Sequence, residues 1–354
     1  MSLNTDISLL LSIVFIVGGL FTLAKSADMF IDAASVLARH FKLSPLLVGM
    51  AVIGFGTSAP ELAVSAISGF GGHANLSLGN AYGSCIFNIG AILGITALVW
   101  PIKVKPSVCW FAVPLLALIT ILSWFIVHDG AFERINGIVL LVTFMILLPA
   151  YCWYDQKGAK AAFETGSEGA GTIRMGWVCF RLVVGLALLV LSSHVLVWGS
   201  VDFARDVLHV SDLLIGLTVV AMGTSLPELA SAVVSARKGE NEFVIGNIVG
   251  SNFFNTLAVV GLAGTISPFS DFSRYVICRD LPVMMLFSLS IALFGLNYRH
   301  LHEAGVISRL KGGIWLVAFI VYLVVMIFQE TGVLGKGVVD HGTVMWPNGA
   351  DLCT

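Results

Sequence analysis

The sequence predicts an all-α polytopic membrane protein with ten transmembrane helices, arranged as two inverted five-helix repeats with broken helices 2 and 7. Three observations lead to this fold class: the chain is strongly apolar, its apolar segments have the length of a membrane span, and its two halves repeat each other. Apolar residues make up 57% of the 354 positions and charged residues 11%, and the mean hydropathy is +0.95. Soluble domains are about 45–50% apolar, so lipid is the expected solvent.

Ten segments are long enough to cross a bilayer, which takes about 20 mainly apolar residues. They are 7–37, 45–69, 76–98, 107–127, 133–153, 176–205, 212–236, 242–265, 275–296 and 310–329. The N-terminus lacks the basic stretch of a cleavable signal peptide, so the first segment is expected to remain as a helix. The six cysteines show no metal or disulfide spacing and are predicted to be small apolar fillers: Cys85, Cys109, Cys152, Cys179, Cys278 and Cys353.

Lysines and arginines are concentrated in the odd-numbered loops, counted from an external N-terminus. Because positive residues remain on the cytoplasmic side, both termini are predicted to lie outside and the longest connection inside, in a bacterial cytoplasmic (inner) membrane. The predicted organisation is a first repeat at 1–154, a polar, glycine-rich cytoplasmic linker at 155–175, a second repeat at 176–330 and a tail at 331–354. No cofactor, nucleic acid or obligatory protein partner is predicted, and a monomer is compatible with the sequence.

The two halves of the chain are copies of each other. A shift of 167 residues aligns 44–94 with 211–261 without a gap, and roughly 22 of the 51 pairs are identical. Each half has five predicted spans, and an odd number makes the second copy enter the membrane from the opposite side. Inverted repeats are typical of secondary transporters, whose site lies near the midplane between equivalent helices.

The second span contains Gly-Thr-Ser-x-Pro-Glu at 56–61, and the seventh repeats it at 223–228. Pro60 removes a backbone donor and its ring crowds the preceding turn, so the span is predicted to break near 54–58 and free carbonyls that can bind cations. Ser58 and Glu61 also have the spacing of a capping box, which is the structural alternative. Apolar flanks place Glu61 and Glu228 deep in the membrane, where acidic residues generally mark ion pathways.

The third span has polar and small residues on one predicted helix face, and the eighth span repeats them. The two sets are Asn80, Gly83, Ser84, Phe87 and Asn88, and Asn247, Gly250, Ser251, Phe254 and Asn255. Helix packing alone would also favour small and polar residues here.

Together the motifs supply two carboxylates, carboxamides, hydroxyls and backbone carbonyls, all of which are hard oxygen donors. A set of six to eight oxygens with two carboxylates suits Ca²⁺, and Na⁺ also prefers oxygen. Without a bound cation the two carboxylates would repel each other, so the site must take up metal, sodium or protons. This requirement is a plausible origin of obligatory exchange.

The repeated pair of motifs, Gly-Thr-Ser-x-Pro-Glu followed about 27 residues later by Gly-Ser-x-x-Phe-Asn, resembles the alpha repeats of the calcium/cation antiporter superfamily, which includes sodium/calcium exchangers. The resemblance implies Ca²⁺/Na⁺ antiport by alternating access, with helices one and six sliding across the other eight. It makes Glu61 and Glu228 the central Ca²⁺ ligands, beside the carbonyls of Thr57 and Thr224. The implied ligands of flanking sodium sites are Ser58, Ser84, Ser225, Ser251 and the backbone of Gly54 and Ala221, with Asn88 and Asn255 at the remaining polar positions.

The sequence departs from the family pattern at two positions, and the first of them, Asn255, leaves the coupling ion open. Some sodium/calcium exchangers have an aspartate where this chain has Asn255, and proton-coupled relatives often have asparagine in both copies, so H⁺-coupled antiport is the alternative. An amide cannot carry a proton, which leaves Glu61 and Glu228 as the obvious proton acceptors. Cys85 replaces the asparagine found at the equivalent Asn252, and only a packing consequence is expected.

Other functional classes use similar residues. A passive cation channel could use the same oxygens, but two half-helices that face each other form a closed midplane site rather than a ring of carbonyls. An intramembrane hydrolase would need a histidine beside Ser58, and none accompanies both copies, so no enzyme is expected. On helix one, Lys25, Asp28 and Asp32 share a face, which predicts either a local salt bridge or a role in ion access.

Overall fold

The structure, a computed structural model, describes residues 2–70, 74–163, 174–206, 221–270 and 275–330. Within these ranges eight helices are long and apolar enough to span a membrane, or nine if the bent pair Pro45–Thr57 and Ala59–Phe70 counts as one span. The predicted span at 212–236 begins in residues outside the described ranges. The membrane-spanning helical character predicted from the sequence is therefore confirmed.

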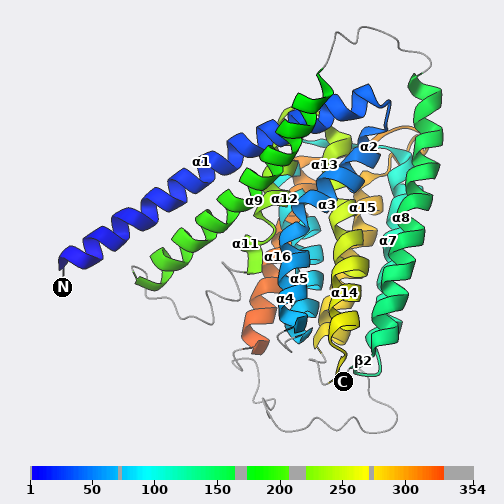
Figure 1. The fold of residues 1–354 in the computed structure, drawn as a ribbon. Helices are drawn as coiled ribbons and strands as arrows, with labels where there is room; N and C mark the ends of the chain where they lie inside the picture. The colour runs from blue at the N-terminus through cyan, green and yellow to red at the C-terminus, as the bar shows by residue number, and fades with distance from the viewer. Residues whose placement is uncertain (1, 71–73, 164–173, 207–220, 271–274, 331–354) are drawn as a thin grey trace. The chain divides into compact units, whose positions relative to one another are not determined.

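The chain forms two compact units, and each takes segments from both halves of the sequence. The first unit comprises 1–61 and 145–251. Its main elements are α1 (Ser2–His40), α2 (Pro45–Val48), the π-helix η1 (Gly49–Gly54), α3 (Phe55–Thr57), α9 (Met175–Asp206), α11 (Ala221–Gly223), α12 (Leu226–Arg237) and most of α13 (Asn241–Phe253). The long helices α1 and α9 lie side by side (Figure 1), and their shared core includes Phe30 and Leu189.

The second unit comprises 62–144 and 252–354. Its described elements are α5 (Ala74–Phe87), η2 (Asn88–Leu93), α6 (Gly94–Val99), β1 (Ile102–Val104), η3 (Val108–Ala112), α7 (Val113–Val127), β2 (Ala131–Phe132), η5 (Phe254–Val259), α14 (Val260–Ile266), β3 (Phe269–Ser270), η6 (Val276–Asp280), α15 (Leu281–Gly295), β4 (Gly305–Ile307) and α16 (Arg309–Glu330). Short antiparallel pairs, β1 with β4 and β2 with β3, join the ends of spans. The unit division falls inside α4 (Ala59–Phe70), α8 (Arg134–Phe163) and α13.

The predicted break of the second span is present. Ser58 leaves the helical conformation with φ −82° and ψ 6°, and the two parts of the span meet at 45°. In the seventh span α11 ends at Gly223, and α12 starts at Leu226 with Pro227 in its first turn. Proline is tolerated in a first turn because the N–H groups there have no intrahelical acceptor, so each Pro-Glu pair begins a new half-helix.

Short π-helices recur at equivalent places in the two repeats, and no prediction anticipated them. The segment η2 begins at Asn88 and η5 at Phe254, next to Asn255, while η3 and η6 open the spans that contain α7 and α15. A π-turn inserts an extra residue into a helix and is often found at functional sites. Their recurrence extends the repeat from sequence to backbone geometry.

The acidic residues of α1 pair with basic residues from other helices, not with Lys25. Asp28 binds Arg237 at 2.5 Å, Lys238 binds Asp32 at 2.5 Å, and Arg181 of α9 lies 3.9 Å from Asp32. The predicted local salt bridge was therefore wrong about its partner, because the end of α12 packs against α1. The Asp32 and Arg237 side chains are 50% and 53% exposed, so each pair contributes about 0–1 kcal/mol.

One cysteine departs from its predicted role as an apolar filler. Cys85, Cys109, Cys152 and Cys179 are free thiols, but Cys278 is disulfide-bonded. Cys353 lies outside the described residues. No cysteine spacing in the sequence predicts this bond.

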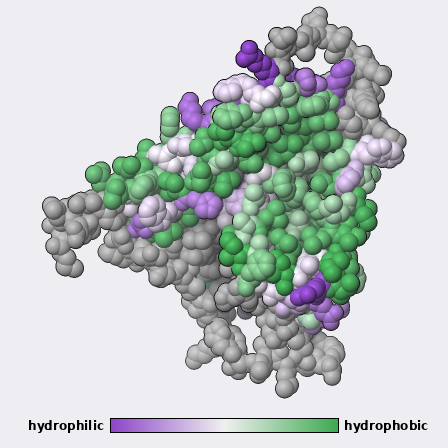
Figure 2. Space-filling model, viewed as in Figure 1, coloured by the Kyte–Doolittle hydropathy of each residue, from purple (hydrophilic) through white to green (hydrophobic). Residues whose placement is uncertain are grey.

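The surface of the described residues is largely apolar. Figure 2 shows hydrophobic side chains over most of the coloured face, with hydrophilic residues gathered in patches. Helices α7 and α16 expose large side chains such as Leu118, Phe125, Leu310 and Val317. Exposed apolar residues at this density would be a liability in water, which agrees with a lipid environment.

Candidate functional site

Two backbone segments of the first unit approach each other closely because glycines face each other. A Cβ atom added to Gly246 of α13 would lie 2.6 Å from the carbonyl oxygen of Leu46, and one added to Gly250 would lie 2.6 Å from Cα of Met50. Contacts this short exclude any side chain at these two positions. The glycines of the second copy therefore let α13 lie directly against η1 and the half-helix break that follows it.

Each of the two motif glutamates is held by a serine of the other repeat. Ser225 donates to Glu61 Oε1 at 3.1 Å, and Ser58 donates to Glu228 Oε1 at 3.2 Å. All four side chains are fully buried. Ser225 makes no side-chain cap of its own helix, so the capping-box alternative does not describe the second copy. The Ser58 and Ser225 hydroxyls instead each bind the glutamate of the other repeat.

The second oxygen of each carboxylate, Oε2, is buried and has no hydrogen-bond partner in the described part of the chain. No lysine or arginine of that part forms an ion pair with either glutamate. Each carboxylate accepts a hydrogen bond from the serine that stands three residues before the other glutamate, so the two groups lie close together. Buried charges without a counter-charge are strongly unfavourable, so this arrangement needs a cation or protons.

Asn247 of α13 makes two further hydrogen bonds next to the break in the second span. Thr57 donates to Asn247 Oδ1 at 3.1 Å, and the Asn247 amide donates to the carbonyl of Glu228 at 3.2 Å. Asn247 lies on the predicted polar stripe but was not among the predicted ligands. Its contacts link the first motif to the second through α13.

The other predicted oxygen donors of the first unit surround these groups. Ser251 lies 3.5 Å from the carbonyl oxygen of Gly54, which also accepts the N–H of Ser58 at 3.1 Å. Thr224 is half-buried between the two half-helices of its span. Ala221 begins α11, and its side chain lies outside the described set. Ser193 of α9, which sequence analysis did not single out, donates to the carbonyl of Gly223 at 2.9 Å.

The second unit contains the predicted amides and Ser84, all of them buried. Asn88 donates to Asn252 Oδ1 at 3.0 Å, and Asn252 donates to the carbonyl of Cys85 at 3.3 Å. The Asn88 Oδ1 atom and both polar side-chain atoms of Asn255 have no hydrogen-bond partner in the described part of the chain. Buried amides usually find partners, so Asn255 is a candidate ligand.

Cys85 explains why Asn255 differs from Asn88. The repeat makes Cys85 equivalent to Asn252 and Asn88 equivalent to Asn255, and Cys85 and Asn252 face each other, with Sγ 3.8 Å from the Asn252 carbonyl oxygen. The symmetry mate of the Asn88–Asn252 bond would join Asn255 to position 85, where a thiol offers no amide oxygen. The expectation that Cys85 affects only packing stays a prediction, and the repeat predicts in addition that an asparagine at position 85 would give Asn255 a hydrogen-bond partner.

Comparison with known proteins shows the family. Residues 11–152 and 177–328 match the family model described as sodium/calcium exchanger protein. The chain belongs to the sodium/calcium exchanger protein family. It is 38% identical to the protein named "Putative antiporter CaxA" of Alkalimonas amylolytica, over 89% of this chain and 98% of that one. It is also 35% identical to the inner membrane protein YrbG of Escherichia coli strain K12, over 87% and 96%.

Two exchangers from this family extend the comparison. The sodium/calcium exchanger MaX1 of Methanosarcina acetivorans is 27% identical over 88% of this chain and 97% of its own length. The solved structure of the sodium-calcium exchanger NCX_Mj, soaked with Na⁺ and Sr²⁺, matches with a TM-score of 0.75 at 28% identity, over 89% of this chain and 99% of that one. Membership confirms the predicted fold class and superfamily. The relatives of this chain that are named for an activity are exchangers and antiporters.

The asymmetry at position 85 leads to a stability prediction. Cys85→Asn should let Asn255 pair as Asn88 does and raise the free energy of unfolding by about 1 kcal/mol, the usual worth of one buried hydrogen bond. Thermal unfolding of the detergent-solubilised chain in chelator, without sodium, measures this effect. Cys85→Ala is the control, since it removes the sulfur and adds no amide. A Cys85→Asn protein no more stable than Cys85→Ala would contradict the symmetry argument.

Proposed function

We propose that the chain exchanges Ca²⁺ for Na⁺ across the membrane by alternating access at a site centred on Glu61 and Glu228. The observation that carries this proposal is the pair of fully buried carboxylates, each with one oxygen bound to a serine and the other without a partner among the described residues. A divalent cation would neutralise both charges at once. The four carboxylate oxygens also match the preference of Ca²⁺ for hard, charged ligands.

The proposed role of each residue is the one that the family resemblance implies for its position. The carbonyls of Thr57 and Thr224, one residue before each serine, would complete the Ca²⁺ site. Na⁺ would bind through the hydroxyls of Ser58, Ser84, Ser225 and Ser251 and the backbone of Gly54 and Ala221. For Ser84, Asn88 and Asn255 the proposal rests on the repeat in the sequence and on the buried, unpartnered amide oxygens of the two asparagines.

Competition between ions explains the obligatory exchange. With Ca²⁺ bound, the carboxylates are neutralised, and without it sodium ions must replace the charge before the site can change access. The Ser58 and Ser225 hydroxyls donate to the same carboxylates that would hold Ca²⁺. Binding of Ca²⁺ at the carboxylates would therefore change the affinity for Na⁺ at the hydroxyls, and the reverse. The ions are substrates, and the proposed function needs neither a resident cofactor nor an obligatory protein partner.

Helices α1 and α9 are the proposed moving element. They pack tightly through glycines: a Cβ at Gly185 would lie 3.0 Å from the backbone of Phe30, and one at Gly19 3.0 Å from that of Leu196. Such packing favours movement of the two helices as one body. Sliding would break the pairs of Asp28 and Asp32 with Arg237 and Lys238, but at about 0–1 kcal/mol each these exposed pairs are a small barrier.

The organisation proposed for the chain is two inverted repeats, 1–154 and 176–330, each supplying one glutamate, with a cytoplasmic linker at 155–175 and both termini outside. The count of lysines and arginines in the loops supports this orientation.

Both glutamates are predicted to be essential. Glu61→Gln and Glu228→Gln each remove one charge and should reduce exchange to the level of protein-free vesicles, because a Ca²⁺ ion facing one carboxylate is no longer neutralised. Ca²⁺ uptake into vesicles under an outward sodium gradient is the measurement. Glu303→Gln, on an exposed loop, is the matched control and should transport normally. Normal transport by either buried variant would eliminate the central site.

The coupling ion is predicted to be sodium. Ca²⁺ uptake should follow an imposed sodium gradient at constant pH and should be insensitive to a pH gradient in sodium-free buffer, because the serine hydroxyls that contact both glutamates are neutral oxygen donors suited to Na⁺. Uptake driven by the pH gradient alone would establish the H⁺-coupled alternative. Flux that ignores both gradients would identify a channel.

The orientation is tested with reporter fusions. Alkaline phosphatase fused after residue 330 should be active, and a green fluorescent protein at the same point should be dark, since both termini are proposed to lie outside. The same reporters placed at residue 165 in the linker are the control and should give the reverse pattern. An inactive phosphatase after residue 330 would show that the topology is inverted.

A further inference from the structure

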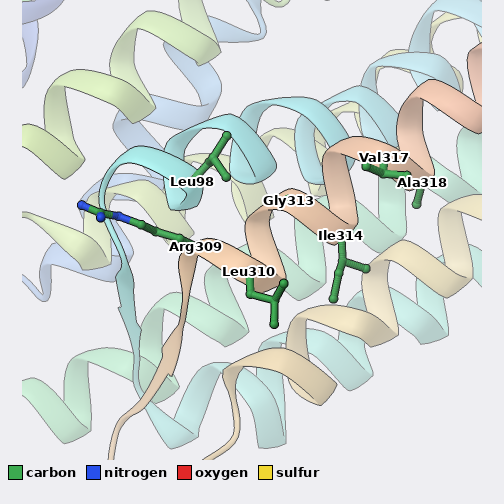
Figure 3. Close-up of a pocket in the computed structure, with 7 residues that line it drawn as sticks. All are labelled: Leu98, Arg309, Leu310, Gly313, Ile314, Val317 and Ala318. Atoms are coloured by element: carbon green, nitrogen blue, oxygen red, sulfur yellow. The ribbon is translucent and has the colours of Figure 1, made fainter.

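A groove in the second unit, between α6 and α16, has no role in the exchange proposed above. It has a volume of about 630 Å³ and is lined by Leu98, Arg309, Leu310, Gly313, Ile314, Val317 and Ala318 (Figure 3). Except for Arg309 every lining residue is apolar. Its volume falls in the range of about 300–1,000 Å³ found for small-molecule sites.

The groove exists because two neighbouring glycines of α16 have different surroundings: Gly312 packs against α6, and Gly313 borders open space. Gly312 packs against α6, where an added Cβ would lie 2.7 Å from the carbonyl oxygen of Gly94. Gly313 points along the open side, where an added Cβ would have only Leu98 Cδ1 near it, at 3.7 Å. The opposite face is filled by Trp315, which is buried and donates to Ser290 at 2.7 Å. The hollow is therefore bordered by side chains on a firmly packed helix.

The outer border of the groove faces lipid. Leu310 is 76% exposed and Val317 62%, so nothing in the described part of the chain covers them. From Arg309 to Ala318 the groove follows nine helical steps, about 14 Å along α16. This length matches one leaflet of a hydrocarbon core that is about 30 Å thick, which fits a single acyl chain.

The one charged residue lies at the end of this groove where α16 begins and α6 ends. Its guanidinium makes one hydrogen bond in the described part, from Nη2 to the Val99 carbonyl at 3.4 Å, and so retains most of its five donors. The nearby Lys311 is already engaged, since its Nζ donates to the carbonyls of Phe294 and Val306 at 2.7 and 3.0 Å. Arg309 is thus the cation that remains available to a ligand.

We propose that this groove binds one phospholipid, with an acyl chain along α16 between Leu98 and Val317 and its phosphate on Arg309. Guanidinium groups bind phosphate oxygens in a two-pronged geometry. Arg299 in the preceding loop and Arg309 and Lys311 at the start of α16 lie at the end of the span that the charge count assigns to the cytoplasm, where anionic lipids attract basic residues. An anionic phosphatidylglycerol therefore fits both ends of the groove.

Native mass spectrometry of the delipidated full chain in detergent tests the proposal, because it counts bound lipids without any transport readout. The wild-type chain should bind one phosphatidylglycerol more tightly than diacylglycerol, which has the same tails and no phosphate. Arg309→Gln should weaken phosphatidylglycerol binding about tenfold, the effect of losing a hydrogen bond to a charged group, and leave diacylglycerol binding unchanged. Gly313→Leu should weaken both, since its side chain fills the groove.

The control is Arg299→Gln, which removes an exposed charge from the same loop outside the groove and should bind like the wild type. Excess inorganic phosphate should not displace the lipid, because the tail provides much of the binding. Equal loss in Arg299→Gln and Arg309→Gln would reduce the effect to general surface charge and overturn the proposal. Wild-type binding by Arg309→Gln, or a dimer mass in place of a lipid adduct, would overturn it as well.

Discussion

Glu61 and Glu228, two buried carboxylates with no basic partner among the described residues, constrain how the rest of the first unit can be arranged. Taking an ion out of water costs several kcal/mol even after the protein relaxes. Ser58 and Ser225 offset part of that cost by donating to Glu228 and Glu61. The remaining oxygens have no donor among the described residues, so the arrangement is complete only when cations or protons arrive.

The crossed hydrogen bonds depend on backbone geometry that only small and irregular residues allow. The break at Ser58 presents Glu61 at the start of a half-helix, and Gly246 and Gly250 let α13 touch the backbone of the segment that precedes the break. The π-helix η2 begins at Asn88, and η5 begins at Phe254, next to Asn255. In both repeats, therefore, irregular backbone accompanies the buried asparagine.

The two copies are nevertheless unequal, and the inequality is chemically meaningful. Asn88 donates to Asn252, but the side-chain amide of Asn255 has no hydrogen-bond partner among the described residues, and the repeat has Cys85 where the other copy has Asn252. Asn255 therefore keeps donor and acceptor capacity that Asn88 has partly used. The repeat is therefore two-fold in sequence but not in the hydrogen bonds of its amides.

The sequence by itself determined the solvent, the spans, the repeat and the place of each glutamate beside a helix break, because hydrophobic length, period and proline chemistry act within one segment. It also pointed to Ser58, Ser225 and Asn247 as polar residues on the correct faces. Only the tertiary structure decided which residues meet: each serine binds the opposite glutamate, and Asp28 and Asp32 pair with basic residues of α9 and the end of α12. These contacts join residues far apart in the chain, so their partners are fixed by how helices pack, and no local pattern specifies that.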